Sequence, residues 1–446
     1  MDPYARKPWL RFYPEGVPPD LRVPEVPLTR LLDDAAEVFP RRTALSYFGR
    51  KISYRELRDQ VDRFASALSG LGVRQGERVA LVLPNCPQAV VAIFATLRIG
   101  AIVVQHNPLY TEPELRHQLI DSGATAAVVY DGAYARFEAA RAGTPVHHVV
   151  TTSLVDYLPR LKQRLLALPL EKARAQRARL TTPLPRGART DDFCELLEAT
   201  TDHARQARFD PARQVAMLQY TGGTTGLPKG AMLTHRNLVA NAYQTRAWDP
   251  GIVEGRETTL GALPLFHVYG LTLGLLTTML AAGQLVLLPT FDLHLALEAV
   301  GKSKPTIFPG VPPMYSQIIA SPESEDYDLS SIRTCVSGAM RLPPETADSF
   351  QEATGGRLVE GYGLTETSPV ALCNPLNRNA RAGTVGIPLP GTEARVVDER
   401  DPRKVVEPGV AGELAVRGPQ VFAGYWGHAG ETAAMLQDGW ILTGDV

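Results

Sequence analysis

The sequence predicts an α/β protein, in which a mostly parallel sheet is covered by helices and is followed by antiparallel strands. Two observations predict this fold class. Over the first 150 residues, and again from Val215 to Glu360, short apolar runs alternate with amphipathic segments, as parallel strands alternate with their crossover helices. After Gly383 the chain changes to short runs broken by glycine and proline, which is typical of antiparallel strands.

The first elements have clear local signals. Residues 43–53, TALSYFGRKIS, predict a short hairpin, and Ser53 with Glu56 has the S-x-x-E spacing of a helix N-cap. The helix that follows carries apolar residues at helical spacing, namely Leu57, Val61, Phe64, Leu68 and Leu71. A second cap of the same kind runs from Thr111 to Glu114.

Buried strands are predicted where short apolar runs lie between turn residues. These runs are RVALVL (78–83), GAIVVQ (100–105), ATAAVVY (124–130) and HHVVTT (147–152), with a helix over roughly 88–98 between the first two. The longest uncharged stretch, Gly261 to Phe291, is interrupted by polar residues, glycines and Pro289. We therefore expect a buried helix, a turn and a buried strand there, and not a membrane-spanning helix.

Length and composition narrow the class of protein. The 446 residues suggest two or three structural parts, which we place at 1–200, 201–370 and 371–446. The 46 Lys and Arg against 47 Asp and Glu give a net charge of -1, so a globally basic nucleic-acid binder is excluded and no nucleic-acid partner is expected. Four scattered cysteines without a CxxC pair indicate neither a zinc ribbon nor a disulfide framework. With no apolar signal core at the start, we expect a cytoplasmic protein.

One segment differs from the rest in charge. From Arg160 to Arg189 there are nine Lys or Arg and a single acid, Glu171, with leucines interleaved. One interpretation is a basic amphipathic segment that makes a weak peripheral contact with an anionic membrane. The other is a solvated surface insertion, which the sequence favours because Tyr157 is the only aromatic residue nearby that could anchor in a membrane.

The sharpest motif is the loop TGGTTGLPKG, residues 221–230, which follows the apolar strand VAMLQ. Its glycines allow backbone N–H groups to approach phosphate oxygens, its threonines add hydroxyls, and Lys229 adds a positive charge. The spacing is not that of a Walker loop, because Leu227 and Pro228 separate Gly226 from Lys229. Composition alone leaves a phosphate loop and a flexible Gly/Thr hairpin as equal alternatives.

Two further motifs carry polar groups suited to a nucleotide. EGYGLTETSP, residues 360–369, places Tyr362 between Gly361 and Gly363, where its ring could lie on a planar ligand. Glu366 in the same motif fits the one or two carboxylates that magnesium–nucleotide sites use. The ending TGDV offers Asp445 to a ribose diol. For each motif taken alone, an ordinary turn with a solvated acidic residue is the alternative interpretation.

Together these motifs carry a resemblance to a known family. TGGTTGLPKG, YGLTE and GWILTGD occur in this order in adenylate-forming enzymes, which include acyl-CoA synthetases, luciferases and peptide-synthetase adenylation domains. The chain resembles this superfamily over nearly its whole length, and four more stretches agree: ISYRELRDQVDRFASAL, PLFHVYG, VSGAMRLPPE and GELAVRGPQVFAGYW. Within the superfamily, FPGVPPMYSQII and DYLPRLKQRLL most resemble fatty acyl-CoA ligases of the long- or medium-chain type.

The resemblance implies a fold and a reaction. Residues 1–446 would be the large N-terminal AMP-binding domain of an acyl-CoA synthetase, with two βα-layered subdomains and a distorted antiparallel β-barrel. A fatty acid would react with ATP to give acyl-AMP and pyrophosphate, and CoA would then displace AMP. This reaction requires that the charge on the phosphates be neutralised and that two anions, the carboxylate and the phosphate, be aligned although they repel each other.

It also implies roles for residues that match the family motifs. The β- and γ-phosphates of ATP would be held by Lys229 and by the loop residues Thr221, Gly222, Gly223, Thr224, Thr225 and Gly226. Adenine would stack on Tyr362, and the base would be surrounded by Gly338, Ala339, Glu360, Gly361 and Gly363. Thr365 would touch the α-phosphate, Glu366 would bind Mg²⁺, and Asp445 would hold the ribose hydroxyls.

For the acid, the resemblance points to His267 in PLFHVYG and to an acyl pocket that includes Val311, Pro312 and Met340. Plain core packing is an equal alternative for the apolar residues. The sequence departs from many relatives at Met340, where they carry proline after Gly-Ala. The acyl chain length that relatives prefer therefore does not predict the preference of this protein.

The resemblance leaves three points open. Family members continue beyond TGD with a small C-terminal lid domain that supplies the adenylation lysine, so we expect these 446 residues alone to adenylate weakly. An enzyme that activates aryl or amino acids or loads a carrier protein, and a non-catalytic nucleotide-binding module, remain alternatives. Relatives often form homodimers, but nothing in the sequence marks an interface.

Overall fold

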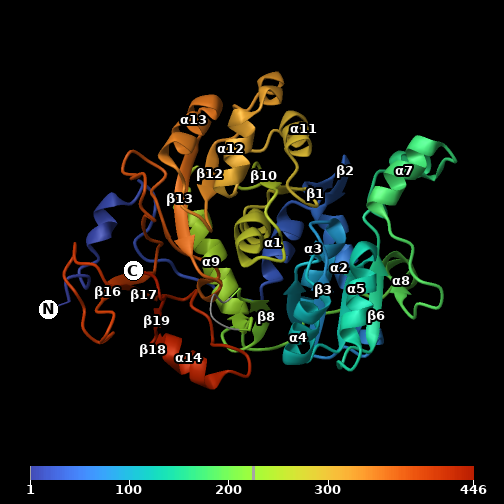
Figure 1. Cartoon of the computed structure of the whole chain (residues 1–446), viewed down its shortest axis with the longest axis horizontal. Coiled ribbons are helices and arrows are strands. Elements are labelled where there is room, and N and C mark those ends of the chain that lie inside the picture. Colours follow the sequence, from blue (N-terminus) through green and yellow to red (C-terminus); the bar gives the residue numbers. More distant parts are fainter. Residues whose placement is uncertain (1, 223–226) are drawn as a thin grey trace.

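The computed structural model describes residues 2–222 and 227–446, and its first layer is a seven-stranded sheet in the order β7-β6-β5-β3-β4-β8-β9 (Figure 1). All neighbours pair in parallel except β8 and β9, which form an antiparallel hairpin. The strands are β3 (Arg78–Val82), β4 (Ile102–His106), β5 (Ala126–Tyr130), β6 (His148–Thr152), β7 (Asp191–Asp192), β8 (Val215–Tyr220) and β9 (Gly230–Thr234).

Helices with strong local start signals cover this sheet. Ser53 accepts the backbone N–H of Glu56 at the start of α2, and Thr111 with Glu114 forms a full capping box at the start of α4. All twelve residues of α3 are buried, because it packs against α2 as well as against the sheet. The helices are α2 (Tyr54–Gly70), α3 (Pro87–Arg98), α4 (Glu112–Ser122), α5 (Asp131–Arg141), α8 (Phe193–Ala199) and α9 (His235–Trp248).

The second layer joins two four-stranded sheets, β10-β11-β1-β2 and β12-β13-β14-β15. Ile307 links them, since it bridges in parallel to Thr259 on β10 and to Thr334 on β12. Its strands are β1 (Thr43–Tyr47), β2 (Arg50–Ser53), β10 (Thr258–Gly261), β11 (Gln284–Leu287), β12 (Thr334–Ser337), β13 (Arg357–Gly363), β14 (Val370–Cys373) and β15 (Ile387–Pro388).

The helices of this half are short. They are α1 (Arg30–Val38), η1 (Pro8–Phe12), η2 (Gly270–Leu276), α10 (Thr277–Leu280), α11 (Leu293–Ser303), α12 (Pro312–Ala320), η3 (Pro322–Asp326), α13 (Pro344–Thr354) and η4 (Thr365–Thr367). The helix η2 is a π-helix whose seven residues are all buried. A π-helix of this kind often occurs at a functional site.

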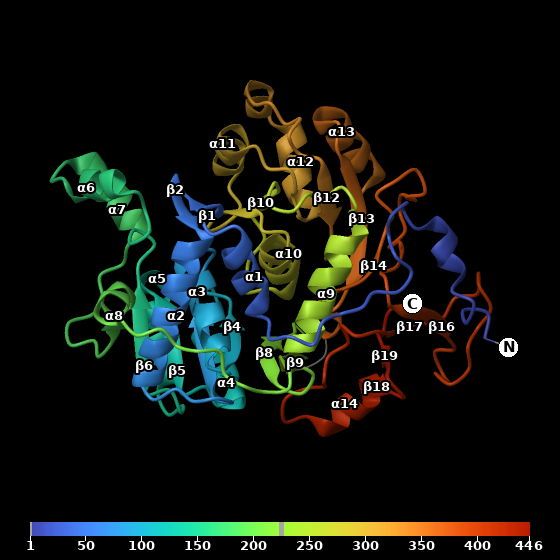
Figure 2. The same cartoon turned by 180° about the vertical axis from the view of Figure 1, so that it is seen from behind.

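The last part is a four-stranded antiparallel sheet, β16-β17-β19-β18, with α14 (Ala429–Met435) beside it. Its strands are β16 (Glu393–Val397), β17 (Glu413–Arg417), β18 (Leu436–Gln437) and β19 (Trp440–Leu442). Both ends of the described chain lie on this side of the molecule (Figures 1 and 2).

The basic segment forms two helices, α6 (Arg160–Ala167) and α7 (Glu171–Leu180), which project from the body (Figure 2). One face of α6 is fastened by Gln163, whose amide donates to the carbonyls of Val155, Asp156 and Leu158 at 2.8–3.1 Å. Among the helices described in this structure, none is long and apolar enough to cross a membrane.

Most predicted elements are confirmed, including the 43–53 hairpin, the four strands, both caps, the buried helix and strand within 261–291, and the antiparallel strands after Gly383. The division at residues 200 and 370 stays a prediction. The layers are interleaved along the chain, because β8 and β9 complete the first sheet while β1 and β2 extend the second.

Candidate functional site

A cavity of about 460 Å³ lies at the carboxyl ends of β12 and β13, where ligands of open α/β sheets commonly bind. It gathers seven of the predicted site residues from three separate motifs: His267, Gly338, Ala339, Gly361, Tyr362, Gly363 and Thr365. Tyr269 also lines it and was missed by sequence reasoning, although it lies within PLFHVYG.

The backbone around this cavity needs its small residues. A Cβ at Gly363 would lie 1.8 Å from the Pro369 carbonyl oxygen, and one at Gly338 would lie 3.0 Å from the Tyr269 ring. Ala339 has φ of +63°, in the left-handed region that non-glycine residues seldom adopt. Strained backbone of this kind concentrates at functional sites.

Tyr362 is joined to the predicted ribose-binding acid. Its hydroxyl donates to Oδ2 of Asp445 at 2.5 Å, and the Asp445 carbonyl accepts the N–H of Leu414 on β17 at 2.9 Å. Burial, followed by this hydrogen bond to a carboxylate, raises the pKa of Tyr362. The structure thus brings together two residues that the sequence analysis assigned to one nucleotide.

Glu366 is buried and has a phenol as its partner. The Tyr425 hydroxyl donates to Oε1 of Glu366 at 2.5 Å, and the Phe422 N–H donates to its carbonyl at 2.8 Å. Burial, followed by the charge of Glu366, raises the pKa of Tyr425. Sequence reasoning missed Tyr425, and its only signal was its place in the stretch GELAVRGPQVFAGYW.

Residues 422–426 pair with β9, which follows the predicted phosphate loop, and lie beside Glu366. Trp426 N–H donates to the Gly230 carbonyl at 2.8 Å, and Met232 N–H donates to the Gly424 carbonyl at 2.9 Å. Because the loop ends where β9 begins, this pairing places the end of the loop beside η4. Lys229 Nζ lies 5.5 Å from the centroid of the Tyr425 ring and 3.6 Å from Oε1 of Glu431.

The base of the loop is closed by the Thr221 N–H, which donates to the Lys229 carbonyl at 3.1 Å. Thr221, Gly222 and Lys229 are therefore placed at the mouth of the hairpin. The predicted phosphate contacts Gly223, Thr224, Thr225 and Gly226 lie outside the described residues.

Glu366 is the residue that the predicted magnesium site depends on. Within residues 2–222 and 227–446, no group of three or more His, Cys, Asp or Glu is placed to hold a metal ion. Glu366 is a single buried carboxylate near the phosphate loop. This fits magnesium, which takes one or two protein carboxylates and completes its shell with phosphates and water.

His267 lies at the end of the cavity nearest to η2. Its ring is accessible within the cavity, yet enough protein surrounds it that burial lowers its pKa below the ordinary value. A neutral imidazole is therefore the dominant form at neutral pH, with one nitrogen as a donor and the other as an acceptor.

Four predicted residues lie elsewhere. Glu360 lines a separate cavity between β13 and α13, together with Leu342 and Asn374, and burial raises its pKa. Met340 is 57% exposed. Val311 is the N-cap of α12 and packs, partly buried, against a hydrophobic cluster, and Pro312 is the buried first residue of that helix. The acyl-pocket assignment of Val311, Pro312 and Met340 stays a prediction, because other residues line the apolar cavity next to the site.

That apolar cavity, of about 530 Å³, was not predicted. It is lined mainly by apolar side chains, among them Trp248 of α9, Leu273 of η2 and Ile307, which bridges β10 and β12. Val336 and Val370 line both this cavity and the one that holds Tyr362, so the two spaces are neighbours.

Comparison with known proteins agrees with this arrangement. The family model described as AMP-binding enzyme matches residues 32–426. A long-chain-fatty-acid–CoA ligase of Bacillus subtilis is 40% identical over 99% of this chain and 78% of its own length. The crystal structure of a long-chain-fatty-acid-CoA ligase from Archaeoglobus fulgidus superposes with a TM-score of 0.82 at 28% identity, covering 97% of this chain and 83% of that one. An anthranilate CoA ligase in complex with anthranoyl-AMP superposes at 0.81 with 25% identity, over 95% and 76% of the two chains.

These matches confirm the predicted fold class, the α/β fold of the acyl-CoA synthetase N-terminal domain. The motifs that suggested the family lie within the matched range, apart from the last. Three of them, PLFHVYG, VSGAMRLPPE and EGYGLTETSP, line one cavity in the structure. The chain belongs to the AMP-binding enzyme family of adenylate-forming ligases.

Proposed function

We propose that the protein activates a fatty acid with ATP and transfers the acyl group to CoA. A carboxylate oxygen attacks the α-phosphorus, the bond to the bridging oxygen breaks, and pyrophosphate leaves. The sulfur of CoA then attacks the acyl carbonyl carbon, the bond to AMP breaks, and the thiol proton passes to solvent.

The observation that carries the proposal is the apolar cavity beside the nucleotide cavity. The shared residues Val336 and Val370 mark the place where a polar head group and an apolar tail would meet. Burial of each methylene in such a space contributes about 0.8 kcal/mol. A hydrocarbon tail therefore fits this space better than a compact polar acid does.

The chain's own residues would supply positioning and charge neutralisation. Lys229 and the loop N–H groups would face the phosphates, Tyr362 the adenine and Asp445 the ribose. The neutral imidazole of His267 would orient the carboxylate through a hydrogen bond without repelling its approach to ATP. Glu366 would hold the magnesium ion that accompanies ATP, and this ion would neutralise phosphate charge.

Two other substrate classes, aryl acids and amino acids, would place a different group in the apolar cavity. An aryl acid would use only the space nearest Val336 and leave most of the apolar cavity empty. An amino acid needs an anionic partner for its ammonium group. Among the residues that the structure describes, the one acid lining the apolar cavity is Asp249, which is already paired with Arg333. A non-catalytic module would bind nucleotide without turnover.

Calorimetric titration with non-hydrolysable acyl-AMP mimics tests the proposal. We expect a fatty acyl mimic to bind more tightly than benzoyl and aminoacyl mimics. Pyrophosphate release with a panel of the corresponding acids then separates an enzyme from a binding module. Equal affinity for all three tails would contradict the fatty-acid assignment.

We also propose a weak peripheral contact between α6 and an anionic membrane. Because Gln163 and Leu166 face the body, Leu161, Leu165 and Leu168 lie at i, i+4 and i+7 on the opposite face and are 69%, 51% and 42% exposed. Exposed cations, including Arg160, Lys162 and Arg164, lie on the same helix. An apolar stripe flanked by cations supports an interfacial helix.

A further inference from the structure

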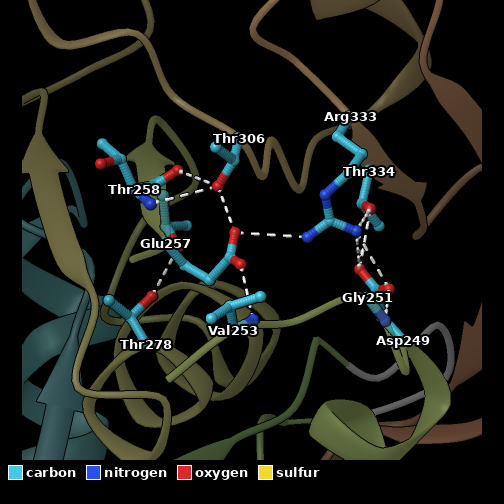
Figure 3. Close-up of polar contacts among 10 residues, drawn as sticks. Asp249, Gly251, Val253, Glu257, Thr258, Thr278, Thr306, Arg333 and Thr334 are labelled. Atoms are coloured by element: carbon cyan, nitrogen blue, oxygen red, sulfur yellow. Dashed lines mark hydrogen bonds and ion pairs between the residues drawn. The ribbon is translucent and has the colours of Figure 1, made fainter. Parts of the chain in front are cut away.

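Three charged side chains form a linked cluster beside the apolar cavity, and we name Asp249, Glu257 and Arg333 the distal clasp (Figure 3). Asp249 lines the cavity, and Arg333 and Glu257 lie behind it. Both acids are buried, whereas the side chain of Arg333 is 39% exposed. The clasp therefore spans the distance from the interior to the surface.

The clasp is closely bonded. Nη1 of Arg333 donates to both carboxylate oxygens of Asp249, at 2.9 and 3.1 Å, and Nη2 lies 3.3 Å from Oε2 of Glu257. Asp249 also accepts the Thr334 hydroxyl at 2.8 Å and the Gly251 N–H at 2.9 Å. Glu257 accepts the Val253 N–H at 2.8 Å and the Thr306 hydroxyl at 2.5 Å. Each acid thus has several donors besides the guanidinium.

The position of the clasp follows from β12. Gly338, just past the end of this strand, lines the nucleotide cavity, Val336 lines both cavities, and Thr334 at the start of the strand lines only the apolar one. Four residues of extended chain span about 13 Å. Asp249 and Thr334 therefore lie at the end of the apolar cavity farthest from the nucleotide, with Arg333 between them and solvent.

We propose that the distal clasp closes the acyl cavity and sets the longest acyl tail that the site accepts. The inference rests on the proposed fatty-acid function and identifies which residues determine specificity. A methyl terminus that reached Asp249 would have to displace a desolvated ion pair, which is costly because the buried carboxylate would lose its partner. Within the described part of the chain, tails that end before Thr334 meet mainly apolar side chains and no charged group.

The test is the affinity of an acyl sulfamoyl-adenosine series, from six to eighteen carbons, measured by calorimetry on the full chain. For the wild type, affinity should rise about fourfold with each methylene until the tail reaches the clasp, and then stop rising. Arg333→Ala opens the end of the cavity. It should move this limit to longer tails, so that tails beyond the wild-type limit gain at least tenfold while short tails change less than twofold.

Arg333→Ala leaves two buried acids without their cation, and loss of folding would then hide the effect on tail length. A second variant therefore disturbs the clasp without removing a charge. Gly251→Ala keeps all three charges but places a Cβ 2.7 Å from Nη1 of Arg333, so the guanidinium must shift. It should move the limit in the same direction. The matched control is Arg141→Ala, which removes an ion pair with Glu138 on α5, remote from the cavity. This control should keep the wild-type limit.

The outcomes separate the two claims. If the wild type binds no fatty acyl mimic, the proposed function and this inference are both wrong. If it binds them but the limit falls at the same tail length in wild type, Arg333→Ala and Gly251→Ala, the fatty-acid function stands and the role of the clasp is overturned.

Discussion

The Tyr362 hydroxyl donates a 2.5 Å hydrogen bond to the Asp445 carboxylate and so links β13 to the segment that follows β19. A ribose diol placed at Asp445 would replace the phenol as the hydrogen-bond partner. In the proposed site, the Tyr362 phenol would therefore occupy the Asp445 carboxylate until a nucleotide binds.

Asp445→Ala should weaken binding of a fatty acyl-AMP mimic by about 10- to 100-fold, since a hydrogen bond to a charged group contributes about 1.5–3 kcal/mol. Tyr362→Phe keeps the ring and the acid, so it should change the affinity much less. Calorimetric titration measures both. The control Asp401→Ala removes an exposed acid that pairs with Arg403. Equal affinities for Asp445→Ala and Asp401→Ala would contradict a ribose contact.

Tyr425→Phe should lower the free energy of unfolding by about 1–3 kcal/mol, because it leaves the buried Glu366 carboxylate without its phenol donor. Urea unfolding of this variant, of Glu366→Gln and of the double variant gives a double-mutant cycle. We expect the two substitutions to be non-additive. Additive losses would mean that the hydroxyl and the carboxylate do not interact in solution.

Gly363→Ala should unfold the site or the protein, because its Cβ would lie 1.8 Å from the Pro369 carbonyl oxygen and backbone cannot move aside cheaply. Gly430→Ala is the matched control. It lies in α14 with no atom within 4 Å of the added Cβ, so it should raise helix stability by up to about 1 kcal/mol. Thermal unfolding of both variants checks this contrast.

Stability should fall in mild acid because of His235. Its Nδ1 accepts the Leu28 N–H at 3.0 Å, and burial lowers its pKa to about 3. The unfolded chain, with a histidine pKa near 6.5, takes up a proton that the folded chain excludes, so stability is lost as pH falls from about 6.5 towards 3. Each such group contributes up to about 1.4 kcal/mol per pH unit. His106, whose pKa burial lowers to about 4, acts in the same direction.

Urea unfolding at pH 7, 6 and 5 measures this slope. His235→Gln should reduce it, and exposed His147→Gln should not. An unchanged slope in His235→Gln would show that this histidine is not held neutral by the fold.

Replacement of Leu161, Leu165 and Leu168 by serine should weaken binding of the protein to vesicles of phosphatidylglycerol. Binding of the wild type should fall as the salt concentration rises, because part of the attraction is electrostatic. Cosedimentation, with phosphatidylcholine vesicles for comparison, measures this. Serine at Val38, Leu109 and Ile120, three exposed apolar residues on other elements, is the control. Indistinguishable binding by the two triple variants would contradict a specific role for α6.

Local signals predicted the elements well, because their causes are local. Ser53 and Thr111 mark helix starts through hydrogen bonds that span three residues, and the strand 78–82 is a continuous apolar run. The assignment of site residues depended instead on motif resemblance. The structure places seven of those residues on one cavity, while Met340 is exposed and Glu360 lies on another cavity.

What the sequence did not predict depends on distant pairs. Arg333 and Asp249 are 84 positions apart, and Tyr425 and Glu366 are 59 apart, so neither pair leaves a local pattern. The apolar cavity is lined from several separate elements, and its volume depends on how they pack. Such features follow from tertiary contacts and not from periodicity.

The pairing of residues 422–426 with β9 has a consequence for the order of biosynthesis. During translation the phosphate-loop hairpin emerges about two hundred residues before the segment that covers its outer strand, and until then β9 is an exposed edge. Contacts so distant along the chain are slow to form. The nascent protein would therefore cover this edge only after residue 422 has been made, so premature termination before that residue would release a chain with an open sheet edge and no phenol partner for Glu366.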